Sequence, residues 1–263
     1  MKPYFYLLAF ALTACHNPSE QKELPKKQLT NYVNPFIGTD GTGNTYPGAM
    51  TPFGMVQLSP DIGIPGWDRI SGYFYPDSII TGFSHTHLSG TGAGDLYDVL
   101  IMPTNSRFNE RIEANNHLPF SYFSHKHETA TAGYYSVDLL SYGIKAELTA
   151  TPRVGVQRYT FPKDEQSKIT IDLGYSINWD KPTETYLKVV DNTTLEGYRF
   201  STGWARNQKV YFVIKLSKPF ADKEFTEEKE NGKSNRSKIL LRYATADNEA
   251  IVVKTALSMH SIA

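Results

Sequence analysis

The sequence predicts an all-β fold, an antiparallel β-sandwich, over residues 29–263, and three observations lead to this expectation. From residue 134 onward, short runs alternate apolar with polar residues at a period of two, the pattern of strands that bury one face. Turn-forming residues separate the runs by about 8 to 20 positions, which favours antiparallel strands over βαβ units. The sequence shows no convincing amphipathic helix longer than two turns.

Eight strands are expected in the second part of the chain, each able to bury one face. They lie at residues 134–140, 144–150, 155–161, 168–173, 194–200, 209–216, 238–243 and 250–257. Residues 223–238 combine a run of charges with Asn231 and Gly232, which predicts a solvated hairpin or loop.

The first part of the folded region reads differently, because Gly and Pro recur every few positions and the apolar runs are short. Loops are therefore expected to dominate there. Since loops on a rigid sheet are the usual place for binding residues, we expect function in the first half and scaffold in the second.

Composition excludes some classes of partner. With 40% hydrophobic residues the chain can form a packed core. The 27 basic and 27 acidic residues cancel, so no summed positive field attracts nucleic acid, and no nucleic-acid partner is expected. The 17 Tyr, 14 Phe and 3 Trp suit strands and also the flat surfaces on which neutral sugar rings stack.

The N-terminus predicts export. Lys2 precedes an apolar run at residues 4–14 that is too short to span a bilayer but has the length of a signal-peptide core. The run ends in Leu-Thr-Ala-Cys, which resembles the lipobox of bacterial lipoproteins. We therefore expect a lipoprotein signal peptide at residues 1–14, lipidation at Cys15, a polar tether at 15–28, and anchoring in the bacterial outer membrane. The alternative is an ordinary signal peptide with a chance cysteine.

Several blocks in the first part of the folded region combine polar, glycine and aromatic residues in a way that core packing does not require. Residues 32–40 read Tyr-Val-Asn-Pro-Phe-Ile-Gly-Thr-Asp, residues 46–49 Tyr-Pro-Gly-Ala, residues 52–61 Pro-Phe-Gly-Met-Val-Gln-Leu-Ser-Pro-Asp, and residues 71–73 Ser-Gly-Tyr. In content and order, these blocks resemble the first domain of the bacterial exo-acting α-mannosidases of glycoside hydrolase family 92.

The resemblance implies a β-sandwich domain that takes part in calcium-dependent, inverting, exo-acting hydrolysis of α-mannosides of N-glycans. In that family a helical (α/α)₆ barrel follows and holds the catalytic carboxylates and most calcium ligands. We expect this chain to be the N-terminal domain alone, without catalytic residues or a metal site of its own. Its partners would be a mannose-containing glycan and the helical barrel, in cis or in trans. The alternative is a catalytically silent, lipid-anchored carbohydrate-binding or structural remnant.

Trp67 and Asp68 are the first candidate substrate-binding residues. Trp67 lies in a Pro- and Gly-rich loop, where an exposed indole has little structural purpose, and the resemblance implies a loop Trp at the substrate. Asp68 could accept a hydrogen bond from a sugar hydroxyl. The alternative is a Trp that covers one end of the sandwich. Trp179 and Trp204 lie nearer to strand ends and are expected to be structural.

His85, His87 and Asp95 are the remaining candidate substrate-binding residues. Two His at i and i+2 of a strand point to one face and could share a metal. Thr91 and Gly92 stand where a further carboxylate ligand would be expected, and Asp95 is the nearest acid. Metal ligation, satisfied structural His and a polar lining of the sugar pocket or domain interface remain open. The resemblance favours the last, because in the family this loop faces the catalytic domain.

The glycines of residues 90–94 do not predict a nucleotide site, because the following residues read as a strand rather than a helix. We expect them to allow tight turns beside a ligand or a second domain, and to lie within an exposed apolar interface at residues 85–95. His125 and His127 are expected on the surface.

Overall fold

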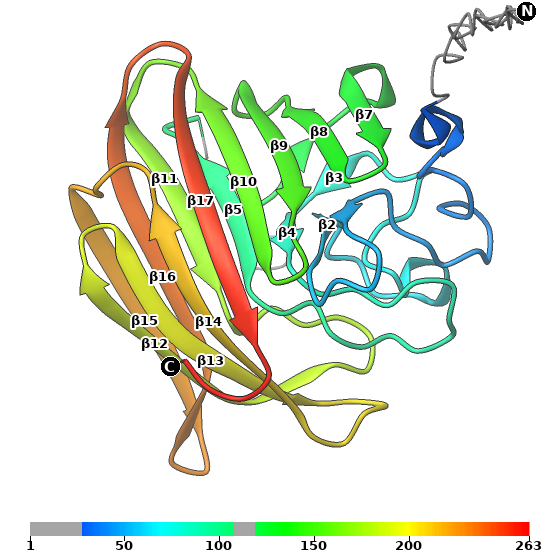
Figure 1. Ribbon diagram of the computed structural model, residues 1–263. Helices are drawn as coiled ribbons and strands as arrows, with labels where there is room; N and C mark the ends of the chain where they lie inside the picture. Colours follow the sequence, from blue (N-terminus) through cyan, green and yellow to red (C-terminus); the bar gives the residue numbers. More distant parts are fainter. Residues whose placement is uncertain (1–27, 108–118, 263) are drawn as a thin grey trace, which may run out of the picture.

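The computed structural model describes residues 28–107 and 119–262, and the predicted antiparallel β-sandwich is confirmed (Figure 1). The predicted signal peptide, the predicted lipidation site Cys15 and most of the predicted tether lie outside the described residues. In the described part of the chain, no helix is long and apolar enough to cross a membrane.

The first sheet has seven strands. In spatial order they are β1 (Ala49–Met50), β2 (Gln57–Asp61), β4 (Gly82–Ser84), β5 (Leu100–Thr104), β11 (Asp164–Asp172), β16 (Lys233–Thr245) and β15 (Asp222–Glu230). The strands that come from the first part of the chain are short, and long loops join them, as the density of Gly and Pro predicts.

The second sheet has eight strands, and every adjacent pair runs antiparallel. In spatial order they are β12 (Lys181–Asp191), β13 (Thr194–Thr202), β14 (Gln208–Leu216), β17 (Glu249–Ser258), β10 (Val154–Phe161), β9 (Ile144–Ala150), β8 (Tyr134–Leu139) and β7 (Glu128–Thr131). A small separate sheet pairs β3 (Ile79–Ile80) with β6 (Ser121–Tyr122). Three 3₁₀ turns, η1 (Leu29–Tyr32), η2 (Trp67–Arg69) and η3 (His125–His127), complete the described elements.

The core lies between the two large sheets and follows the predicted alternation. On β17, Ile251, Val253 and Thr255 are fully buried, whereas Lys254, between the last two, is exposed. Ile169 and Ile171 of β11, in the opposite sheet, are buried in the same core cluster. All eight predicted strands are confirmed. The alternation is clear on β10, β14, β16 and β17, whereas β8, β9 and β11 each contain three or more consecutive buried residues.

Two long strands differ from the sequence-based prediction. All nine residues of β15 are exposed, so the strand has no apolar face and no period-two signal. Its hairpin with β16 turns at Asn231 and Gly232, whose φ angles of 53° and 78° are those of a type I′ turn. The residues predicted as a hairpin or loop are therefore a hairpin that forms one edge of the first sheet. The second unpredicted strand, β12, contains Pro182 and many charges.

A buried arginine joins the two sheets. Arg199 of β13 is 1% exposed and donates to the carboxylates of Asp98 and Asp180. It also donates to the carbonyl oxygens of Leu173, at 3.0 Å, and Tyr175, at 2.9 Å, both just beyond β11. Burial alone lowers the pKa of Arg199, but the two carboxylates outweigh it and raise the pKa, so the guanidinium stays charged.

Replacement of Arg199 by Met should destabilise the fold by about 3 to 5 kcal/mol, because it leaves two buried carboxylates without their cation. Urea unfolding followed by circular dichroism would measure the change. Lys188→Met is the control, since its ammonium pairs with Glu196 at the surface and the unfolding midpoint should not move. Equal midpoints for both variants would contradict the role given to Arg199.

Candidate functional site

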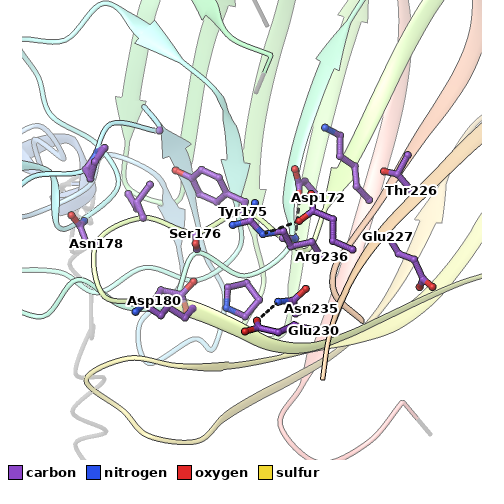
Figure 2. A pocket seen from close by; sticks show the side chains of 18 residues that line it. Asp172, Tyr175, Ser176, Asn178, Asp180, Thr226, Glu227, Glu230, Asn235 and Arg236 are labelled. Carbon is purple, nitrogen blue, oxygen red and sulfur yellow. Dashed lines mark hydrogen bonds and ion pairs between the residues drawn. The ribbon is translucent and has the colours of Figure 1, made fainter. Parts of the chain in front are cut away.

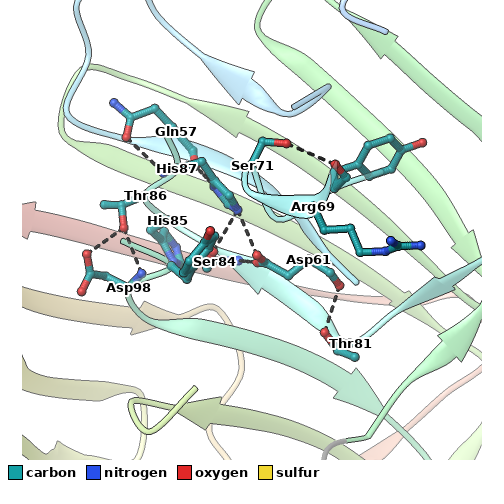
Figure 3. Close-up of polar contacts among 12 residues, drawn as sticks. Gln57, Asp61, Arg69, Ser71, Thr81, Ser84, His85, Thr86, His87 and Asp98 are labelled. Atoms are coloured by element: carbon teal, nitrogen blue, oxygen red, sulfur yellow. Dashed lines mark hydrogen bonds and ion pairs between the residues drawn. The ribbon is translucent and has the colours of Figure 1, made fainter. Parts of the chain in front are cut away.

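The His-Thr-His segment continues from β4 and is buried throughout (Figure 3). Thr86, between the two histidines, donates its hydroxyl to Asp98 at 2.7 Å. The main chain of His87 forms an isolated antiparallel bridge with Leu96, so the segment is paired with the far end of the glycine-rich loop.

His85 is 0% exposed, and both of its ring nitrogens have partners within the domain. Nδ1 lies 2.8 Å from the carbonyl oxygen of Val99 and must therefore be the protonated nitrogen. Nε2 accepts from the side-chain amide of Gln157 at 3.1 Å. Burial lowers the pKa of His85 to about 4, so the ring is neutral. These contacts match the structural alternative for His85, and its atoms offer no surface to a sugar.

His87 is 3% exposed and lies in a second buried network. Its Nδ1 donates to the carbonyl oxygen of Gln57 at 2.7 Å. Its Nε2 lies 3.1 Å from Asp61 Oδ1 and 3.0 Å from Ser84 Oγ. Asp61 Oδ2 accepts from the backbone N–H of Ser84 at 2.9 Å. The ring thus fixes β2 against the end of β4.

Ser84, His87 and Asp61 have the composition of a nucleophilic triad but not its geometry. In such a triad the carboxylate binds one imidazole nitrogen and the serine the other. Here Ser84 and Asp61 both approach Nε2, while Nδ1 is bound to a backbone carbonyl. Ser84 and Asp61 are also 0% exposed. The cluster is a structural polar network and is closed to substrate.

Gly72 closes this network from outside. Its φ is +85°, and a Cβ built on it would come within 2.5 Å of Asp61 Oδ1 and 3.0 Å of the His87 ring. Only glycine fits both the backbone angle and the close approach. The Gly of the Ser-Gly-Tyr block is therefore required by the Asp61–His87 pair.

Asp95 is 1% exposed and serves as an anchor for a distant loop. Its carboxylate accepts from the backbone N–H groups of Trp204, at 3.0 Å, and Ala205, at 2.8 Å, and from the side-chain amide of Gln208. A Cβ on Gly203 would come within 1.9 Å of Asp95 Oδ1, so the loop packs directly on the carboxylate. Asp95 holds Trp204 in place rather than facing a ligand itself.

Trp67, the leading candidate, is 58% exposed. Its indole rests on Gly92, where an added Cβ would meet Trp67 Cη2 at 3.0 Å. The η2 turn that bears Trp67 is fixed by a bidentate ion pair between Arg69 and Asp77, at 2.7 and 2.8 Å. Asp68 follows Trp67 in the same turn and is half-buried.

Trp179 and Trp204, which were expected to be structural, are 46% and 73% exposed. The same glycine-rich loop that supports Trp67 also holds these two residues. The backbone N–H of Trp179 donates to Gly94 O at 3.0 Å, and Asp95 holds Trp204. The loop of residues 90–95 is thus a common base for all three tryptophans of the chain.

Trp204 could have been recognised from the sequence, because it follows Gly203 in a polar segment just as Trp67 follows Gly66. An indole after glycine in a polar loop has few apolar neighbours to bury it. The hydrogen bonds of Asp95 with Trp204 and Ala205 have no local signal in the sequence, because these partners lie 109 and 110 positions further along the chain.

The described residues do not provide a metal site. No group of three or more His, Cys, Asp or Glu in residues 28–107 and 119–262 could hold an ion. Calcium takes six to eight oxygen ligands, whereas the two histidines of the His-Thr-His segment are committed to backbone and side-chain partners. The calcium ligands that the family resemblance implies stay a prediction.

The exposed apolar surface lies elsewhere than expected. Within residues 85–95, the three-residue His segment and residues 93–95 are buried. Large exposed apolar side chains instead occur earlier in the chain, among them Tyr32, Ile37 and Phe53, which are 73%, 74% and 104% exposed. Domain interfaces bury such surface, which makes this N-terminal segment the better candidate for contact with a second domain.

The other histidine pair is only partly superficial. His127 has a side chain that is 55% exposed, as predicted. His125 stacks on Tyr75 with ring centroids 3.9 Å apart, and its Nδ1 lies 2.7 Å from the buried carboxylate of Glu128. Tyr73 and Tyr135 donate to the same carboxylate, so His125 belongs to a structural network.

Comparison with known proteins identifies relatives over almost the whole sandwich. The sequence model of the glycosyl hydrolase family 92 N-terminal domain matches residues 32–258. The structure of the family GH92 α-mannosidase BT3965 from Bacteroides thetaiotaomicron is 35% identical, with a TM-score of 0.76 over 89% of this chain and 34% of that one. It has also been determined in complex with mannoimidazole.

Two further relatives are more distant. The inverting mannosidase BT2199 of the same family and organism is 27% identical, with a TM-score of 0.69 over 89% of this chain and 32% of that one. An uncharacterized secreted glycosidase of Arthroderma benhamiae is 29% identical over 143 residues, or 51% of this chain and 17% of that protein. The chain thus spans about a third or less of the length of these relatives.

The burial of His85 predicts a pH-dependent stability. Because its pKa falls from 6.5 when unfolded to about 4 when folded, the unfolded chain binds the extra proton first. Stability from this group is complete above pH 6.5 and is lost as the pH falls to 4, by roughly 3 kcal/mol. His85→Asn keeps a donor for Val99 and should flatten this part of the urea-unfolding profile. Parallel profiles for both proteins would contradict the assignment.

Gly72→Ala should destabilise the domain by at least about 2 kcal/mol more than a glycine substitution without a clash. Gly232→Ala is the matched control, because its φ is +78° but an added Cβ meets nothing within 4 Å. Thermal unfolding of both variants measures the difference. Similar losses would mean that backbone strain alone, and not contact with Asp61 and His87, requires glycine at position 72.

Proposed function

We propose, because the chain belongs to the glycosyl hydrolase family 92 N-terminal domains, that it is the substrate-contacting domain of an exo-acting α-mannosidase. The enzyme would remove terminal mannose from N-glycans by an inverting, calcium-dependent reaction. The observation that carries this proposal is Trp67, an indole that is 58% exposed in a chain that can bury its aromatic residues. An open indole face is a stacking surface for the apolar face of a sugar ring.

The position of Trp67 is fixed before any ligand arrives. The Arg69–Asp77 ion pair holds its turn, the side-chain oxygen of Asn178 accepts from the backbone N–H of Gly66, and Gly92 supports the ring. Preorganisation of this kind reduces the entropy cost of binding. Asp68, half-buried beside Trp67, is proposed to accept a hydrogen bond from a sugar hydroxyl.

The catalytic groups are proposed to come from outside the described residues. An inverting glycosidase needs two carboxyl groups on opposite sides of the sugar, about 6.5 to 9.5 Å apart. The buried carboxylates Asp61, Asp95 and Asp98 are each committed to two or more hydrogen bonds within the domain. A helical (α/α)₆ domain, in cis or in trans, would supply the acid and the base.

The same domain would hold most ligands of the calcium ion, in agreement with the lack of a group of three or more His, Cys, Asp or Glu in the described residues. The helical domain is proposed to pack on the exposed apolar side chains of residues 29–53. We also propose export and a lipid anchor at Cys15, in agreement with a relative that is described as a secreted glycosidase.

Trp67→Ala should weaken binding of methyl α-mannoside by about tenfold or more, equivalent to roughly 1.4 kcal/mol, because the stacking surface is removed. Isothermal titration of the purified chain measures the affinity. Tyr122→Ala is the matched control, since Tyr122 is 56% exposed on β6 and its ring contacts Phe120, and this variant should bind as the unmodified chain does. The chain alone should release no mannose.

Unchanged affinity in Trp67→Ala would remove Trp67 from the site. Rapid mannose release by the chain alone would contradict the assignment of catalysis to a separate helical domain. Binding without release is the expected result. If the chain binds mannoside but addition of the helical domain produces no hydrolysis, the alternative of a silent carbohydrate-binding module is supported instead.

A further inference from the structure

A polar basin lies at the edge of the first sheet, between residues 174–182 and the β15–β16 hairpin (Figure 2). Its volume is about 670 Å³, which is enough for more than one sugar ring. Figure 2 shows Asn178 at one end of the basin, Thr226 and Glu227 at the other, and Asp172 and Arg236 between them.

The basin presents both donors and acceptors of hydrogen bonds. Asp172 is 9% exposed, and its Oδ1 accepts from the backbone N–H of Gly174 at 2.8 Å. Lys238 is its cross-strand neighbour on β16. The Asn235 amide nitrogen donates to Glu230 at 2.9 Å, and the side-chain oxygen of Asn235 remains an acceptor. Arg236 lies 3.7 Å from Glu228, too far for a hydrogen bond, and its side chain is 56% exposed.

The charge of the basin is mixed, which argues against a strongly ionic ligand. Its acidic groups are Asp172, Asp180, Glu227, Glu228 and Glu230, and its basic groups are Lys181, Arg236 and Lys238. Asp180 forms a buried ion pair with Arg199, which also pairs with Asp98. A neutral molecule with many hydroxyl groups can use carboxylate, amide and guanidinium partners at once, because each hydroxyl both donates and accepts.

An aromatic groove adjoins the basin. It has a volume of about 570 Å³ and is formed by Trp179, Trp204 and four neighbours, of which Asn178 and Lys181 also line the basin. The turn at residues 178–181 is therefore the shared wall of the two depressions. On the other side, Asn178 accepts from Gly66, the residue before Trp67.

We propose that the aromatic groove and the polar basin together bind a glycan of several sugar residues beyond the terminal mannose. Trp179 and Trp204 stack on sugar rings, and Asp172, Asn235 and Arg236 bind hydroxyl groups in the basin. This inference rests on the proposed function and extends it, because it makes the domain select for the length of the glycan.

The buried anchor of Trp204 supports this role. An indole that is 73% exposed gains little from burial, yet Asp95 gives up its solvation to fix the two backbone N–H groups behind that indole. A rigid, exposed indole next to uncommitted polar groups is what a sugar-binding surface requires. Continuity through Asn178 with the Trp67 turn places the surface beside the proposed terminal-mannose contact.

The test compares methyl α-mannoside with a linear α-linked mannopentaose by isothermal titration of the full chain. The pentaose should bind at least tenfold tighter. Trp204→Ala and Arg236→Ala should each remove most of this gain and leave the affinity for methyl α-mannoside unchanged. Asn235→Ala provides a third, smaller truncation, so that the test does not depend on one variant folding well.

Two matched controls separate the basin from general surface effects. Arg242→Ala changes an arginine on the same strand as Arg236, but Arg242 pairs with Glu224 and does not line the basin. Tyr122→Ala removes an exposed aromatic ring from β6. Both controls should retain the full advantage of the pentaose. Unfolding midpoints of all variants identify any loss that comes from the fold.

Equal affinities for the two sugars, or basin variants that behave as the controls do, would overturn the inference and leave the proposed function intact. Absence of binding to either sugar would overturn both. If Trp204→Ala or Arg236→Ala weakened association with the helical domain in trans but not pentaose binding, the surface would be a domain interface and the inference would be overturned.

Discussion

The buried guanidinium of Arg199 is the interaction on which the rest of the structure depends. It extends from β13 of the second sheet to two carbonyl groups beyond β11 of the first. Its two carboxylate partners, Asp98 and Asp180, belong to the segments on which the candidate surfaces are built. Arginine suits this position because its planar group can donate five hydrogen bonds in fixed directions and stays charged when buried.

Each of the two carboxylates, held by Arg199, in turn fixes the position of a loop. Asp98 also accepts from the hydroxyl of Thr86, between the two buried histidines, and so fixes the segment that leads into the glycine-rich loop. Asp180 ends the turn that contains Asn178 and Trp179, the wall between the aromatic groove and the basin. A single buried cation thus orders both the support of the tryptophans and the shared wall. A loop-rich half without such an anchor would leave exposed indoles mobile and costly to order on binding.

The strands of the second half could be predicted because one-sided burial imposes a period of two on the sequence. β15 could not, because its stability comes from main-chain pairing with β16 and its side chains bury no face. The exposure of Trp67 could be predicted from its Pro- and Gly-rich loop. His85 and His87 are ambiguous from the sequence, since i, i+2 spacing describes a shared face and not whether that face points into the core or to solvent. The contact of Asp95 with Trp204 joins residues 109 positions apart, and only the tertiary fold brings them together.

Under the proposed function, the division between buried and exposed polar groups explains how the sandwich can contact a substrate while the reacting carboxylates lie in another domain. In the first half of the chain, Asp61, His85, His87 and Asp95 satisfy one another, backbone groups or neighbouring amides, so none is free to transfer a proton to a substrate. Because the hydrogen-bonding groups of these side chains are satisfied within the domain, they hold the loops above them in place before a ligand binds. Substitutions that change the number or spacing of the exposed tryptophans and basin residues would then leave the core undisturbed. Catalysis and selection of the glycan would therefore depend on separate parts of the protein, with chemistry supplied by the helical domain and shape by the sandwich.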